Sequence, residues 1–177
     1  LHVFGTGHEV WVEDKAQVLT GVAYGAVAWA DYNRDGYLDL ALSGLDPNNQ
    51  EVLKLYRNDR GVLREDLDQT EFVPVRYSAL AWGDYDGDGD LDLIASGRDA
   101  LGNPQTILYR NGGEGRSGES TGAAAGRLAV DTANTDVLVK VAQGTLAWGD
   151  YDNDGTPDLV LTGIGANGVR FSRLYKN

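Results

Sequence analysis

The 177-residue chain carries 27 Asp and Glu against 15 Lys and Arg, a formal net charge of −12, and neither Cys nor Met. The lack of cysteine excludes disulfides, zinc–thiolate sites and a thiol nucleophile. The acidic balance argues against nucleic acid and anionic membranes as partners, because both need basic patches. No run of 18 apolar residues occurs, so the sequence predicts no membrane insertion. The length fits one domain, residues 1–177.

The acidic residues are strongly clustered. Twelve of the 20 Asp fall in three nine-residue windows, 31–39, 84–92 and 150–158, which read DYNRDGYLD, DYDGDGDLD and DYDNDGTPD. Each window places oxygen-bearing side chains at positions 1, 3, 5 and 9 and a glycine at position 6, where a sharp turn is needed. Carboxylates gathered in this way repel one another and need a counter-ion. The windows therefore predict metal-binding loops.

Calcium is the predicted ion, because hard oxygen ligands without His or Cys favour it over zinc or copper, and magnesium prefers to keep several waters. Position 7 of each loop is expected to contribute its backbone carbonyl. Three Ca²⁺ sites follow, one for each loop. The predicted ligands are Asp31, Asn33, Asp35, Tyr37 and Asp39; Asp84, Asp86, Asp88, Asp90 and Asp92; and Asp150, Asp152, Asp154, Thr156 and Asp158.

An EF-hand begins with the same pattern but needs a bidentate Glu at position 12. Leu42, Ala95 and Leu161 stand at that position here. The segments that follow the loops, LDLALSG, LDLIASG and PDLVLTG, are short, apolar and closed by Gly, which predicts strands. Three solvated turns without metal are the other alternative, and the identical register of three copies argues against it.

Two frames repeat along the chain. A-W-[AG]-D-Y begins at residues 28, 81 and 147, and L-Y-[RK]-N begins at residues 55, 108 and 174. Each repeat predicts a strand, a loop, a second strand, a hairpin, a third strand and a variable fourth strand, around 62–75 and 128–141, with Pro74 at a sheet edge. Four antiparallel strands in about 53 residues are typical of a propeller blade.

The predicted fold is therefore all-β, with three four-stranded antiparallel propeller-type blades that are part of, or assemble into, a larger propeller or fibre. The repeats span 5–58, 59–111 and 112–177. The third begins with a Gly/Ser-rich insertion, 112–126, which we expect to be an exposed loop. Trp29, Trp82 and Trp148 precede the loops at the same position, and we expect them to pack between blades.

The string AWGDYDGDGDLDLIASG, repeated together with LYRN, resembles the FG-GAP/VCBS repeats, which are similar to the calcium-binding blades of the integrin alpha-chain propeller. The resemblance implies that each loop joins the first two strands of a blade and binds Ca²⁺. The family propeller usually has seven blades, whereas this chain has three loops. Asn33 stands where the other two loops have Asp, a substitution that the motif tolerates.

A non-catalytic extracellular or cell-surface protein with a structural or adhesive role is the favoured function. Both histidines, His2 and His8, lie outside the repeats, and no nucleophile or phosphate-loop motif occurs. A glycan-binding module that uses aromatic residues is the first alternative. A fragment of a polysaccharide-active propeller enzyme is the second.

The third repeat ends directly after its third strand, whereas residues 8–13, HEVWVE, form a spare strand before the first repeat. An open sheet edge invites pairing with another chain. We therefore expect residues 8–13 of one chain to dock on the last blade of another, giving a closed dimer or a head-to-tail fibre. Other surface proteins are alternative partners. The competing explanation is a chain cut from a longer propeller, because residues 1–4 resemble the end of a preceding strand.

Overall fold

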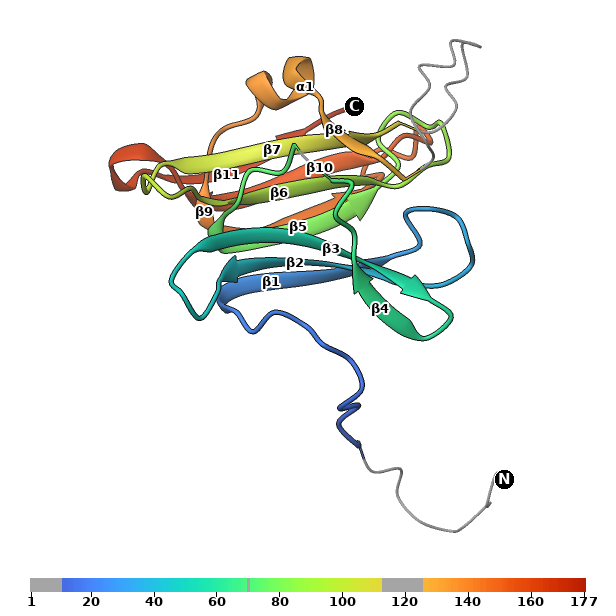
Figure 1. Ribbon diagram of the computed structural model, residues 1–177. Coiled ribbons are helices and arrows are strands. Elements are labelled where there is room, and N and C mark those ends of the chain that lie inside the picture. The colour runs from blue at the N-terminus through green and yellow to red at the C-terminus, as the bar shows by residue number, and fades with distance from the viewer. Residues whose placement is uncertain (1–10, 70, 113–125) are drawn as a thin grey trace.

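The computed structural model describes residues 11–69, 71–112 and 126–177, which form three antiparallel sheets (Figure 1). Sheet 1 has the order β1 (Ala23–Ala30), β2 (Asp39–Leu45), β3 (Glu51–Asp59) and β4 (Val62–Glu65). Sheet 2 has the order β5 (Arg76–Gly83), β6 (Asp92–Arg98), β7 (Pro104–Asn111) and β8 (Leu128–Val130). Sheet 3 contains β9 (Ala142–Gly149), β10 (Asp158–Ile164) and β11 (Arg170–Tyr175), with β10 in the centre.

The second strand of each sheet begins at the last Asp of an acidic loop and continues as an apolar run. β2 and β6 are buried over their first six residues, because neighbouring strands flank them and neighbouring sheets or loops cover their faces. β10 has the same sequence pattern but is partly exposed. The all-β class and the first three strands of each repeat are thus confirmed.

The three sheets stack through their first strands, because β5 contacts both β1 and β9. They form an open stack and do not close into a propeller (Figure 1). The loops between the first and second strands lie at one rim of the stack, and the hairpins between the second and third strands lie at the opposite rim (Figure 1). This arrangement brings the acidic loops of successive sheets side by side.

The prediction of four strands in every sheet is wrong for sheet 3, which has three strands in the described part of the chain. The fourth strands of the other sheets are also shorter than predicted. β4 ends at Glu65, so Pro74 lies in the connection to sheet 2 and not in an edge strand. β8 ends at Val130, and a short helix, α1 (Thr132–Val137), follows because the Asp131 side chain accepts the Asn134 backbone N–H and caps it.

Each sheet is tied to the segment that precedes it by the tyrosine of the L-Y-[RK]-N frame. The Tyr56 hydroxyl accepts the backbone N–H of Thr20 at 3.0 Å. The Tyr109 and Tyr175 hydroxyls accept the N–H groups of Val73 at 2.9 Å and of Val139 at 2.8 Å. In each case the two residues are 36 positions apart, so the contact recurs with the repeat.

Residues 113–125 of the predicted insertion lie outside the described residues, but both of its flanks are in place. β7 pairs with β8 up to Asn111 and Leu128, and the Gly112 N–H donates to the Arg127 carbonyl. The insertion therefore connects the two strands of a closed hairpin.

We expect replacement of residues 113–125 by a two-residue Asn-Gly turn to leave the fold intact, because the flanking ladder already holds the strands together and a short turn lowers the entropy of closing the loop. Far-UV circular dichroism and a melting curve within a few degrees of the parent would bear this out. Loss of the cooperative transition would show that the insertion helps to hold sheet 2.

The spare N-terminal strand, residues 8–13, falls mostly outside the described residues. Its described part, 11–13, is not in a strand, and Trp11 and Val12 are fully exposed. Docking of this segment on another chain stays a prediction.

Candidate metal centre

The three acidic loops share one pattern of internal hydrogen bonds. The carboxylate at position 1 accepts the N–H of the position 6 glycine, at 2.9 Å in loop 1 (31–39) and 3.0 Å in loops 2 (84–92) and 3 (150–158). The carboxylate at position 5 accepts the N–H of position 7 at 2.9, 2.9 and 3.0 Å. Gly36, Gly89 and Gly155 have φ of 87°, 92° and 91°, a conformation that favours glycine. These turns fold the alternating carboxylates toward one another.

Two of the loops gather three carboxylates each within the described chain. Oxygens of Asp84, Asp86 and Asp88 lie within 4.8 Å of one another, and so do oxygens of Asp150, Asp152 and Asp158. Loop 1 carries the neutral Asn33 at position 3, so it has one carboxylate fewer there, and the Asn33 amide donates to Asp35 at 3.1 Å. The geometry thus brings three predicted carboxylates together in each of loops 2 and 3, without Asp92 in loop 2 and without Asp154 in loop 3.

An unsatisfied oxygen in loop 2 fits a cation. The Oδ1 atom of Asp84 is buried and has no hydrogen-bond donor, which costs about 1–3 kcal/mol for a buried polar atom. Burial, with the charge of Asp88, raises the pKa of Asp86 above its usual range. A hard divalent cation among these oxygens would supply the missing partner and remove the repulsion. The donor set, all oxygen, fits Ca²⁺.

The carboxylate at position 9 has a second task that the sequence did not reveal. Asp39, Asp92 and Asp158 are buried. Asp92 accepts the N–H of Tyr85 at 3.2 Å and that of Asn111 at 2.8 Å, and the other two make the equivalent bonds. Burial raises the pKa of Asp39 to about 6 and that of Asp92 to about 7. Position 9 therefore joins each loop to the third strand of its sheet.

Basic side chains from the third strands reach loops 2 and 3. Arg110 Nε lies 2.6 Å from Asp86 and its terminal nitrogen lies 3.5 Å from Asp88. Lys176 pairs with Asp152 and lies 3.3 Å from Asp154. These residues occupy the third position of the L-Y-[RK]-N frame, which was the signal available in the sequence. They partly neutralise the loops, so a bound cation would compete with them.

Loops 1 and 2 are joined by an ion pair. Arg34, at position 4 of loop 1, places its Nε atom 2.9 Å from Asp90 and also donates to the Gly89 carbonyl. The Asp90 side chain therefore faces the neighbouring loop, while its backbone carbonyl stays the predicted ligand. The charge of one loop is balanced in part by its neighbour.

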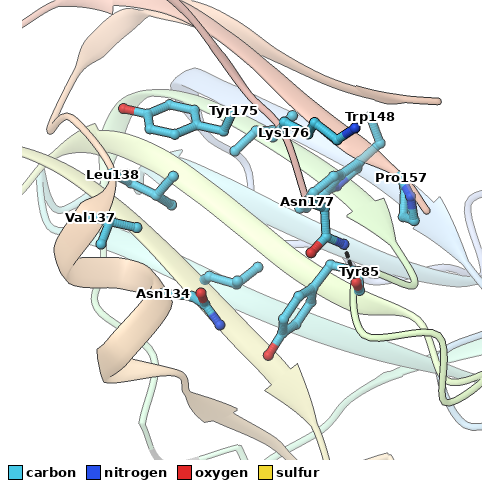
Figure 2. Close-up of a pocket in the computed structure, with 11 residues that line it drawn as sticks. Tyr85, Asn134, Val137, Leu138, Trp148, Pro157, Tyr175, Lys176 and Asn177 are labelled. Atoms are coloured by element: carbon cyan, nitrogen blue, oxygen red, sulfur yellow. Dashed lines mark hydrogen bonds between the residues drawn. The ribbon is translucent and has the colours of Figure 1, made fainter. Parts of the chain in front are cut away.

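The asparagine of the L-Y-[RK]-N frame fastens sheets 2 and 3 to the loop of the sheet before them. Asn111 in sheet 2 donates to the Tyr32 carbonyl of loop 1 at 2.7 Å. Asn177 makes the equivalent bond from sheet 3 to the Tyr85 carbonyl of loop 2, as the dashed line in Figure 2 shows. The Tyr32 hydroxyl donates to Asp66 at 2.6 Å. The Tyr85 hydroxyl donates to Asp131 at 2.6 Å in the same way, so the loop tyrosines of the first two sheets hold their loops to the segment that follows each sheet.

A cavity of about 120 Å³ lies between sheets 2 and 3 (Figure 2). Most of its wall is apolar, with Leu108, Trp148 and Leu159 among the lining residues. Its polar groups come from Tyr, Asn and Lys residues, and the lining contains neither carboxylate nor histidine. The cavity therefore resembles a packing gap between two sheets.

The three stacked sheets are similar, and each carries its own copy of the acidic loop between its first and second strands. These features define a repeat protein built from blade-like units. The sequence profile of the FG-GAP-like repeat matches residues 31–95 and 84–161, two overlapping stretches that together cover most of the chain. The chain belongs to the FG-GAP-like repeat family, which confirms the resemblance seen in the sequence. Comparison with curated proteins and with solved structures gives no match.

Proposed function

We propose that this chain is a non-catalytic, calcium-binding FG-GAP-like repeat domain with a structural or adhesive role outside the cell. The observation that carries the proposal is the buried, donor-free Asp84 oxygen within a cluster of three carboxylates. The family supports an adhesive or structural domain. Each loop binds one Ca²⁺, and loop 1 binds most weakly because Asn33 contributes no charge.

The proposed extracellular location rests on the calcium affinity expected for loops of this kind. Extracellular calcium modules bind at roughly 10⁻⁴–10⁻³ M, a range in which the sites are filled outside the cell and empty in the cytosol. Partial neutralisation by Arg110 and Lys176 keeps the affinity of loops 2 and 3 in this range. Among the described residues, no helix is long and apolar enough to cross a membrane.

Calcium titration of an Asp88→Ala variant tests the proposal. Asp88 belongs to the loop 2 cluster, so its removal should lower the stoichiometry from three Ca²⁺ per chain to two in isothermal titration calorimetry. Asp68→Ala is the matched control, because Asp68 is an exposed acid outside the loops, and it should keep the parent stoichiometry. If the parent chain shows no calcium heat at millimolar concentrations, the metal-binding function is excluded.

A further inference from the structure

The far face of sheet 3 has the sequence of a buried face but is exposed. Ile94 of β6 is 0% exposed and Leu108 of β7 is 4% exposed, because sheet 3 covers them. Val160 and Leu174 occupy the same positions in sheet 3 and are 42% and 53% exposed. Tyr151 is exposed as well, whereas the equivalent Tyr32 is buried. An exposed apolar sheet face of this kind marks a surface for a protein contact.

Two internal contacts show what covers such a face. Trp82 of sheet 2 stacks on Tyr32 of loop 1, with ring centroids 6.1 Å apart, and donates to the Ala28 carbonyl at 3.2 Å. Trp148 of sheet 3 lies against Gly83 of sheet 2, where an added Cβ would come within 2.7 Å of the indole. In each contact, the tryptophan before the acidic loop packs on the face of the preceding sheet.

Among the residues that the structure describes, the first tryptophan of this series packs on no preceding sheet. Trp29 is 53% exposed, and Val27 and Leu38 beside it on sheet 1 are exposed too. Their equivalents in sheet 3, Leu146 and Pro157, are buried or half-buried. Within residues 11–69, 71–112 and 126–177, the complementary, tryptophan-bearing face of sheet 1 is therefore left without a partner.

Sheet 3 keeps a hollow at the matching place. The hollow measures about 180 Å³ and is lined by Trp148, Gly149, Tyr151, Val160 and Leu174, among others. Gly149 is the equivalent of Gly83, and no atom lies within 4 Å of a Cβ built on it. The space that an indole fills over Gly83 is open over Gly149.

We propose that the chain associates head to tail, with sheet 1 of a second copy packed on sheet 3 of the first and Trp29 of the second copy seated over Gly149. A second copy is the expected partner of the exposed sheet 3 face, because the same two kinds of face already meet twice inside the chain, between sheets 1 and 2 and between sheets 2 and 3. Such a contact is heterologous and forms a closed ring only if its rotation allows. Two copies supply six sheets, within the range of about 4–8 blades in closed propellers, so a closed dimer is the expected product.

The edge of sheet 3 supports the same contact independently. β3 and β7 are each covered by a fourth strand, whereas the outer edge of β11 is unpaired in the described chain. Glu65 of β4 lies eight residues before Val73, and Val130 of β8 lies nine residues before Val139. Trp11 and Val12 lie nine and eight residues before Thr20, the equivalent of Val73 and Val139. When sheet 1 of a second copy docks on sheet 3, Trp11 and Val12 of that copy are thus placed to pair with the outer edge of β11.

Sedimentation of the whole chain over a dilution series in millimolar Ca²⁺ tests the proposal. The monomer has a mass of 19.0 kDa, and the closed dimer has twice that mass. Trp29→Ala should weaken association by roughly 30-fold or more, as expected for a central tryptophan anchor. Gly149→Leu should do the same by filling the hollow, while the open space around Gly149 leaves the monomer folded.

Leu101→Ala is the matched control, because Leu101 is an exposed apolar side chain in the hairpin between β6 and β7, away from both faces, and it should leave the assembly unchanged. Circular dichroism verifies that each variant is folded. An open polymer of the parent chain that is lost in both Trp29→Ala and Gly149→Leu would also support the contact. It would mean that the rotation between successive copies does not close a ring. A monomer at every concentration, or an assembly indifferent to both variants, would overturn the proposal.

Discussion

Calcium should raise the melting temperature of this protein, and a chelator should lower it again. A ligand that binds only the folded state stabilises it by about 2.7 kcal/mol at 100 times its Kd. With Kd values of roughly 10⁻⁴ M, about 10 mM Ca²⁺ is 100 times the Kd and should therefore contribute about 2.7 kcal/mol per filled site. For a chain of this size, 1 kcal/mol corresponds to roughly 2–4 °C, so the clusters of loops 2 and 3 together should add about 11–22 °C.

Differential scanning calorimetry with EDTA, Ca²⁺ or Mg²⁺ separates this effect from general screening of the net charge of −12. Mg²⁺ at the same concentration screens equally but fits a flexible all-oxygen loop poorly, so it should add only a small part of the calcium shift. Equal shifts with both ions would mean that charge screening, and not a coordinated ion, stabilises the loops.

Substitution Asp92→Ala should destabilise the fold even without metal. Its carboxylate is buried and accepts two backbone N–H groups, from Tyr85 and Asn111. Each buried donor left without a partner costs about 1–3 kcal/mol, so the loss of two partners should lower the free energy of unfolding in EDTA by roughly 2–6 kcal/mol. Urea unfolding followed by tryptophan fluorescence measures this change.

Asp86→Ala is the matched control for Asp92→Ala. Asp86 belongs to the same loop, but burial and the charge of Asp88 raise its pKa, and it accepts a single long backbone bond of 3.3 Å. In EDTA its loss should change the free energy of unfolding by less than about 1 kcal/mol, because an exposed ion pair such as that with Arg110 contributes little. Equal costs for the two variants would contradict the distinct role of position 9.

The repeat motifs determined most of what could be predicted from the sequence. Asp at position 9 followed by an apolar run placed the start of β2, β6 and β10 to within one residue, because a loop that ends in a buried carboxylate leads directly into a buried strand. The hairpins and third strands followed from the constant spacing between the two frames. Packing between sheets was predicted correctly for Trp82 and Trp148 but not for Trp29, which is 53% exposed because no sheet precedes sheet 1 in the described chain.

The fourth strands could not be placed because they lie outside the repeated motifs. The segment 128–141 has enough branched apolar residues for a strand, but Asp131 caps a helix one residue after β8 ends. Contacts between distant side chains were equally hidden. The pairing of Arg34 with Asp90 depends on how two loops meet at the rim, and sequence spacing within one repeat carries no information about that distance.

The tyrosine bonds that tie each sheet to its own upstream segment also bear on how the chain is made. Tyr56, Tyr109 and Tyr175 each reach back 36 residues, so every sheet is completed by contacts that are local in the sequence. The entropy of closing each of these loops is similar and modest. Domains fold from the N-terminus as they leave the ribosome, and here each new sheet arrives with an indole that covers the apolar face of the one before it. The fold is thus suited to growth one sheet at a time during translation.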